Sequence, residues 1–175
     1  NRSPRRARSK ARWRRDDARF NLGVAYHRVG DYRRAVAQLE ILRERHFEFP
    51  GSARALSQAY FARGLVLFDA ELIKQALTFF DKSSDLREHA DVRYAMGLAH
   101  LKQEDLVAAE YSFSRAIELE PDHVPALHNL AVVYEQTDRP HMATPLLNQV
   151  VQLTPHLATI DAARNATYDE TVLME

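Results

Sequence analysis

The chain of 175 residues contains no cysteine and only five glycines. Without cysteine, neither a disulfide framework nor a thiolate metal site can form. No apolar run reaches the roughly 18 residues that a membrane-spanning helix needs, and the chain shows no secretory leader. We therefore expect one domain in the cytoplasm, either free or held at a membrane surface or by an anchor outside this sequence.

Acidic residues are missing from the first fifteen positions. This segment carries eight basic side chains, Arg2, Arg5, Arg6, Arg8, Lys10, Arg12, Arg14 and Arg15. Because the whole chain has 24 basic and 24 acidic residues, positions 16–175 hold 16 basic and 24 acidic ones. The pattern predicts a mobile basic arm, 1–15, on an acidic body. Its role stays open between binding nucleic-acid phosphates, contacting an anionic membrane, and serving as a solubilising or intersubunit tail.

Catalytic and metal-binding signatures are also missing. The sequence has no H-E-x-x-H, G-x-S-x-G, phosphate-binding glycine loop or dinucleotide fingerprint. The eight histidines are scattered, and the closest pair, His123 and His128, lacks the spacing of a helical metal site. Acidic residues such as Glu40, Glu44 and Glu118 fit a solvated helix surface better than paired general acid–base groups. We expect no cofactor, no metal and no enzymatic activity.

What the sequence does contain is a repeat of about 34 residues. It divides positions 16–157 into four units, 16–49, 50–89, 90–123 and 124–157. The last two units align without a gap, but equivalent positions of the first two lie 41 residues apart. The seven extra residues amount to about two helical turns, so one helix should be roughly two turns longer than usual, from about Ser52 to Asp69. The insertion fits either before Ser57 or after Gly64.

Each unit is predicted to form two amphipathic helices joined by a tight turn. Gly23, Gly64 and Gly97 occupy corresponding positions, where the missing side chain would let the paired helix approach closely. Pro145 falls inside the second helix of the last unit, where proline costs about 3 kcal/mol unless the helix starts late or bends.

These features resemble the tetratricopeptide repeat family, whose pattern reads W-x2-L-G-x2-Y, then A-x3-F, then P. The third unit matches with Met96-Gly97, Ala109-x3-Phe113 and Pro121, although no unit has the opening tryptophan. His100 replaces the tyrosine of that unit, and we interpret it as a hydrogen-bonded core residue, with a pH switch as the alternative. The resemblance implies an all-α, right-handed solenoid of four helix pairs whose first helices line the concave side.

The two ends of such a solenoid expose an apolar face and need a polar cover. We expect residues 158–175 to form a capping helix on the fourth unit, with Ile160, Ala163, Ala166 and Val172 spaced for that contact. At the other end, Trp13 is expected to act as a packing lid.

In this family, ligands usually contact the second, fifth, ninth, twelfth and thirteenth residues of each first helix. Carried to this sequence, the resemblance implies a groove lined by Phe20, Val24, His27, Gln58, Phe61, Leu65, Phe68, Tyr94, Leu98, Leu101 and His128. The Lys, Asn and Arg of the chaperone-binding subfamily are missing, because Phe20, Val24 and Asp91 stand in their places. The apolar and aromatic groove suits an amphipathic helix or an apolar extended segment of a partner protein.

The expected function is therefore that of a non-catalytic adaptor that binds a partner polypeptide in this groove. Packing of the same side chains against neighbouring repeats is the competing interpretation. The alternative function is an assembly factor held at a membrane or a nucleic acid by its arm, through Arg5, Arg6, Arg8, Lys10, Arg12, Arg14 and Arg15.

Overall fold

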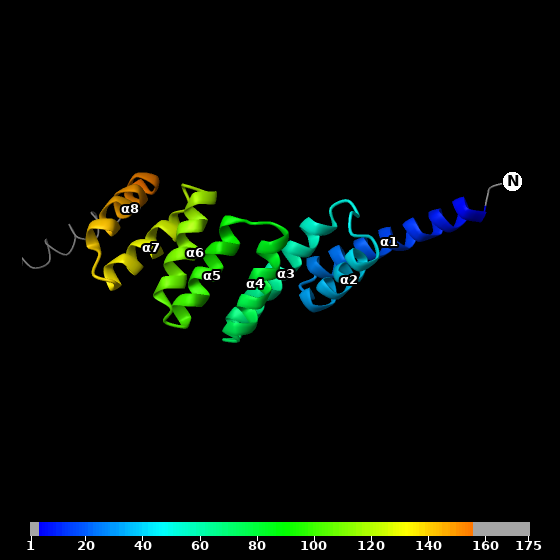
Figure 1. Cartoon of the computed structure of the whole chain (residues 1–175), viewed down its shortest axis with the longest axis horizontal. Coiled ribbons are helices and arrows are strands. Elements are labelled where there is room, and N and C mark those ends of the chain that lie inside the picture. The colour runs from blue at the N-terminus through cyan, green and yellow to red at the C-terminus, as the bar shows by residue number, and fades with distance from the viewer. Residues whose placement is uncertain (1–3, 156–175) are drawn as a thin grey trace, which may run out of the picture.

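The computed structural model describes residues 4–155, and within this range it contains eight α-helices and no strand. The helices are α1 (Pro4–Arg28), α2 (Tyr32–Arg45), α3 (Ser52–Asp69), α4 (Ile73–Leu86), α5 (Ala90–Lys102), α6 (Leu106–Leu119), α7 (Val124–Gln136) and α8 (Pro140–Leu153). Consecutive helices pack as pairs, and the pairs follow one another along the long axis of the molecule (Figure 1). The predicted all-α solenoid is confirmed.

The same three-residue turn joins the two helices of every pair. Its middle residue has a left-handed backbone in all four units, with φ of 80° at Gly30, 60° at Glu71, 60° at Glu104 and 54° at Asp138. The next N–H then returns to the first helix, as in the bond of 2.9 Å from Asp31 to the Tyr26 carbonyl. This bond satisfies a carbonyl at the end of the first helix and reverses the chain.

A first-helix glycine faces a large second-helix side chain in three of the four units. A Cβ atom placed on Gly64 would lie 2.5 Å from the Phe80 ring, and one on Gly97 would lie 2.4 Å from the Phe113 ring. Gly23 faces Leu39 in the same way at 2.7 Å. The prediction that these glycines permit close helix approach is confirmed.

Helix α3 has 18 residues against 13 in α5 and in α7, and α1 reaches 25 residues because it includes the basic arm. Because Gly64 and Gly97 make equivalent contacts, α3 and α5 can be aligned on them. The five extra residues of α3 are then its first five, Ser52–Leu56. The predicted bounds are confirmed, and the insertion precedes Ser57.

The basic arm is largely helical, while its mobility stays a prediction. Residues from Pro4 onward are helical and continue into α1, which projects beyond α2 (Figure 1). Proline fits the first helical position, and the Arg, Lys and Ala residues that follow favour a helix more than their charge opposes it. Trp13 packs as the expected lid, with its ring centroid 4.6 Å from that of His46 and 6.3 Å from that of Phe49.

The last helix, α8, continues through Pro145 without starting late. Because proline has no N–H, the helix gives up the hydrogen bond to the His141 carbonyl. Val151 on this helix is 54% exposed, whereas its equivalent one unit earlier, Ile117, is half-buried against α7. The expected cap, residues 158–175, lies outside the described residues, so its contact with α8 stays a prediction.

Replacing Gly97 by alanine should destabilise the protein, because the new methyl group has to displace the fully buried Phe113 ring. We expect the free energy of unfolding in urea to fall by about 1–3 kcal/mol, the usual cost of overpacking. Unit four has Ala131 and Leu147 at the two equivalent positions. Adding Phe113→Leu to Gly97→Ala should therefore cost less than the sum of the two single changes. An increase in stability for Gly97→Ala alone, as helix propensity would give, would contradict the contact.

Truncation after His156 should expose the outer face of α8. Since repeat stability is roughly a sum of units and nearest-neighbour interfaces, we expect a lower melting temperature or self-association. Thermal denaturation with light scattering measures both. A truncated protein that remains monomeric and equally stable would show that residues 157–175 cover nothing.

Candidate functional site

The predicted groove residues all lie on first helices, and most of them are only partly accessible. Gln58, Leu65 and His128 are exposed, while Phe20, Val24, His27, Phe61, Phe68, Tyr94, Leu98 and Leu101 are half-buried. Phe61 and Phe68 pack against the buried cluster around Phe80, and Tyr94, Leu98 and Leu101 pack against the one around Phe113. These rings and aliphatic chains thus belong partly to the core and partly to the surface.

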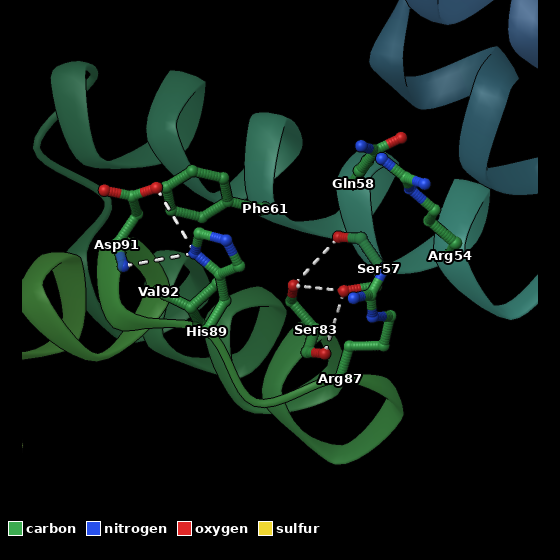
Figure 2. A pocket seen from close by; sticks show the side chains of 9 residues that line it. All are labelled: Arg54, Ser57, Gln58, Phe61, Ser83, Arg87, His89, Asp91 and Val92. Carbon is green, nitrogen blue, oxygen red and sulfur yellow. Dashed lines mark hydrogen bonds and ion pairs between the residues drawn. The ribbon is translucent and has the colours of Figure 1, made fainter. Parts of the chain in front are cut away.

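The structure brings two predicted groove residues, Gln58 and Phe61, into one pocket between α3 and α5. This α3–α5 pocket has a volume of about 330 Å³ and is lined by Arg54, Ser57, Gln58, Phe61, Ser83, Arg87, His89, Asp91 and Val92 (Figure 2). Arg54, Gln58 and Phe61 follow one another at intervals of four and three residues, so they lie on one face of α3. Leu98, Leu101, Phe20 and His128 do not line this pocket.

Two buried serines hold α3 to the end of α4 beneath the pocket. Ser83 donates its hydroxyl to the Ser57 carbonyl at 2.8 Å, and the Ser57 hydroxyl lies 3.1 Å from the Ser83 carbonyl. The two hydroxyl oxygens are 3.0 Å apart. Both side chains are therefore used in joining the helices.

The cationic side of the pocket consists of Arg54 and Arg87, both exposed. Among residues 13–155, whose side chains the structure describes, neither guanidinium has a hydrogen-bond or ion-pair partner. Other arginines nearby are paired, since Arg93 and Arg115 both bind Glu88, at 2.8 and 2.9 Å. The pocket therefore presents two unneutralised positive charges.

The acidic side of the pocket is Asp91, which lies between two histidines. One carboxylate oxygen is 3.3 Å from Nδ1 of His89, and the other is 3.4 Å from Nε2 of His123. His123 accepts the Ala126 N–H on Nδ1 at 3.1 Å, so its Nε2 carries the proton and faces Asp91. This contact links the start of α5 to the start of α7.

Sequence reasoning missed Arg54, Ser57, Ser83, Arg87 and His89. Arg54 lies in the helical extension, and Ser83, Arg87 and His89 lie at the end of α4 or in the following loop. None of them occupies a first-helix position at which the family contacts its ligands. The one signal that could have pointed to this place is the seven-residue insertion between the first two units.

A second pocket, of about 460 Å³, lies between α2 and α4 and includes Glu40, Tyr60 and Lys82. Here the polar groups satisfy one another. The Tyr60 hydroxyl donates to Glu40 at 2.6 Å, and the Lys82 ammonium lies 3.8 Å from the same carboxylate. Burial and the neighbouring Glu40 raise the pKa of Tyr60, so its hydroxyl remains a donor at physiological pH.

His100 does not form the hydrogen bond expected of it. The side chain is half-buried, and its Nδ1 atom is shielded from solvent without a hydrogen-bond partner in the described chain. Nδ1 is bonded to Cγ and therefore lies close to the backbone. The hydroxyl of the tyrosine that His100 replaces would lie at the far end of the ring. The hydrogen-bond prediction was therefore wrong, and the pH-switch interpretation stays a prediction.

No helix among residues 4–155 combines the length and the apolarity of a bilayer-spanning segment. No group of three or more histidine or carboxylate side chains in that range is arranged to hold a metal ion.

Family models of the tetratricopeptide repeat match residues 20–87, 90–123 and 112–144. The chain belongs to the tetratricopeptide repeat family, whose fold generally serves as a scaffold for protein–protein interaction and is typically non-catalytic.

Solved structures of MamA have the same fold. A crystal structure of MamA superimposes with a TM-score of 0.60 at 18% sequence identity, over 86% of this chain and 84% of that chain. MamA from Desulfovibrio magneticus RS-1 gives a TM-score of 0.54 at 20% identity, over 81% and 76% of the two chains. Identities this low establish a common fold alone.

The curated relatives are parts of much longer proteins. Protein O-mannosyl-transferase TMTC3 of Homo sapiens is 32% identical over 99 residues, which cover 53% of this chain and 11% of that protein. Protein O-mannosyl-transferase Tmtc3 of Drosophila melanogaster is 35% identical over 68 residues, which cover 39% and 7%. The chain thus spans about a tenth of the length of these relatives, or less.

Proposed function

We propose that the chain is a non-catalytic adaptor that binds a segment of a partner polypeptide along its first helices, centred on the α3–α5 pocket. The observation that carries the proposal is the composition of this pocket. It lies between two successive first helices, and Gln58, Phe61 and Asp91 stand there at positions through which the family contacts its ligands.

The size of the pocket supports a peptide rather than a small molecule. A volume of about 330 Å³ is at the lower end of ligand cavities, and it accommodates one or two side chains of a longer segment. Such a segment can continue over Leu65, which is 39% exposed on α3 one turn beyond Phe61. Leu65 belongs to none of the buried clusters, so the core does not depend on this side chain. Leu65 is therefore available for contact with a partner.

The hydrogen bonds of the two serine hydroxyls in the pocket support a non-catalytic role. Activation of a serine nucleophile requires a base within hydrogen-bond reach. Ser57 and Ser83 instead bond to each other and to backbone carbonyls, and no histidine or carboxylate of residues 4–155 is hydrogen-bonded to either.

A photo-crosslinking residue in place of Gln58 should attach the intact protein to its partner, because Gln58 is exposed at the pocket. The same residue in place of Tyr111, which is 59% exposed on the second helix α6, is the matched control and should not crosslink. Mass spectrometry of the products identifies the partner and the attached residue.

Once the partner is known, Phe61→Ala combined with Phe68→Ala should weaken its binding by more than about thirtyfold, because truncating even one aromatic anchor often costs 2 kcal/mol or more. Glu118→Ala, on the outer helix α6, should leave binding unchanged. Crosslinking from position 111 alone, or full binding by a folded double variant, would place the site elsewhere. Unfolding of the double variant would mean that the two rings serve the core.

A second candidate function concerns the basic arm. The segment holds eight cations and no acid, and from Pro4 it belongs to a helix that projects beyond α2 (Figure 1). We propose, as the alternative, that this projection holds the protein at an anionic membrane or on a nucleic acid. About 1 kcal/mol per cation near an anionic surface would suffice for attachment.

Neutralising Arg5, Arg6, Arg8 and Arg12 to glutamine tests the arm without removing Trp13. The full chain should bind vesicles with a third of phosphatidylserine, or a DNA duplex, and lose that binding as salt rises. The variant should bind neither. Cosedimentation and fluorescence anisotropy distinguish the two ligands, and binding that is equal in both proteins would exclude the arm.

A further inference from the structure

The α3–α5 pocket carries more charge than the apolar groove expected from the sequence. We propose that it selects an acidic side chain of the bound peptide, whose carboxylate pairs with Arg54 and Arg87. This rests on the proposed function, that the pocket binds a polypeptide segment, and it adds the chemical class of that segment.

The two arginines are held by backbone that cannot easily move away. The Arg87 N–H donates to the Ser83 carbonyl at 3.0 Å, and that carbonyl also accepts from the Ser57 hydroxyl. Arg54 precedes Ser57 by three residues, within one turn of α3. The hydrogen bonds between Ser57 and Ser83 therefore fix the backbone positions of Arg54 and Arg87. Less backbone entropy is then lost when the two arginines pair with a ligand.

The charges of these arginines are available, unlike those of their neighbours. Arg93 and Arg115 share Glu88, and Arg139 binds Glu110 through two nitrogens at 3.1 and 2.6 Å. Arg54 and Arg87 have no such partner among the described side chains, those of residues 13–155. A guanidinium pairs with a carboxylate through charge-assisted hydrogen bonds, which are shorter and stronger than neutral ones.

Asp91 is the one carboxylate among the nine residues that line the pocket. Figure 2 shows Asp91 and His89 on one side of the pocket, with Arg54 and Gln58 on the other. Nε2 of His123 faces one oxygen of the Asp91 carboxylate at 3.4 Å, so this acid already has a donor from the start of α7. Nδ1 of His89 instead accepts the Asp91 N–H. An entering carboxylate is thus directed to the arginine side, with the half-buried Phe61 ring available to the aliphatic part of its side chain.

The two arginines also occupy other positions than the carboxylate-binding residues of the chaperone-binding subfamily, which are missing here. Arg54 belongs to the five-residue extension of α3, and Arg87 is the residue that ends α4. Neither position lies among the five first-helix positions of the family pattern. The acidic selectivity would therefore depend on one arginine from the insertion and one from the end of α4.

Two pools of short fluorescein-labelled peptides test the inference with the full chain. Leucine and phenylalanine occupy the same positions in both pools. The positions between them hold glutamate and aspartate in the acidic pool, and glutamine and asparagine in the neutral pool. We expect anisotropy titrations to show the acidic pool binding about tenfold more tightly or better. Arg54→Gln with Arg87→Gln should remove this preference, and Asp91→Asn should strengthen binding of the acidic pool.

The matched control is Arg33→Gln with Lys74→Gln, which changes the net charge equally at two exposed cations outside the pocket. This variant should retain the preference for the acidic pool. Circular dichroism and the melting temperature show that each variant is folded.

The outcomes separate this inference from the proposed function. Equal binding of the two pools, blocked by Gln58→Trp but not by the arginine changes, would overturn the acidic selectivity and leave the peptide site standing. A preference that the control variant also loses would reduce the effect to overall charge and overturn it. Failure of both pools to bind would overturn it as well, while crosslinking from position 58 still decides whether a partner docks there.

Discussion

The contact between a first-helix glycine and a buried second-helix ring fixes the geometry of the two central units. It sets the distance between α3 and α4 at Gly64 and Phe80, and between α5 and α6 at Gly97 and Phe113. Phe61 and Tyr94 each lie three residues before the glycine, with ring centroids 5.9 and 5.8 Å from those same buried rings. The packing that closes the core thus also orients the half-exposed rings of the first helices.

The α3–α5 pocket depends on the one first helix of the central units that is longer than the repeat requires, α3. Aligning α3 and α5 on their glycines puts all the extra length of α3 at its N-terminal end, next to the loop between α4 and α5. Arg54 enters the pocket from that extension, while the hydrogen-bonded pair Ser57 and Ser83 ties it to the end of α4. The greater length of α3 therefore supplies one of the two arginines of this pocket.

The repeat period and the three glycines sufficed to predict the fold and the bounds of α3, because both depend on local spacing. The pocket could not be predicted in the same way, because Arg87 and His89 come from a loop with no place in the family pattern. The basic arm was predicted from its charge alone, although its Arg, Lys and Ala residues also favour a helix. His100 is a further example. The sequence places an imidazole at a tyrosine position, but it does not show whether a ring nitrogen comes within hydrogen-bond distance of a partner.

Hydrogen exchange on the complex with the crosslinked partner tests the central claim, that the partner lies across the first helices at the α3–α5 pocket. We expect amide exchange in residues 52–68 and 87–98 to be slower in the complex than in the free protein, with exchange in α2 and α6 unchanged. Slower exchange confined to the second helices or to α1, with 52–68 unaffected, would contradict it.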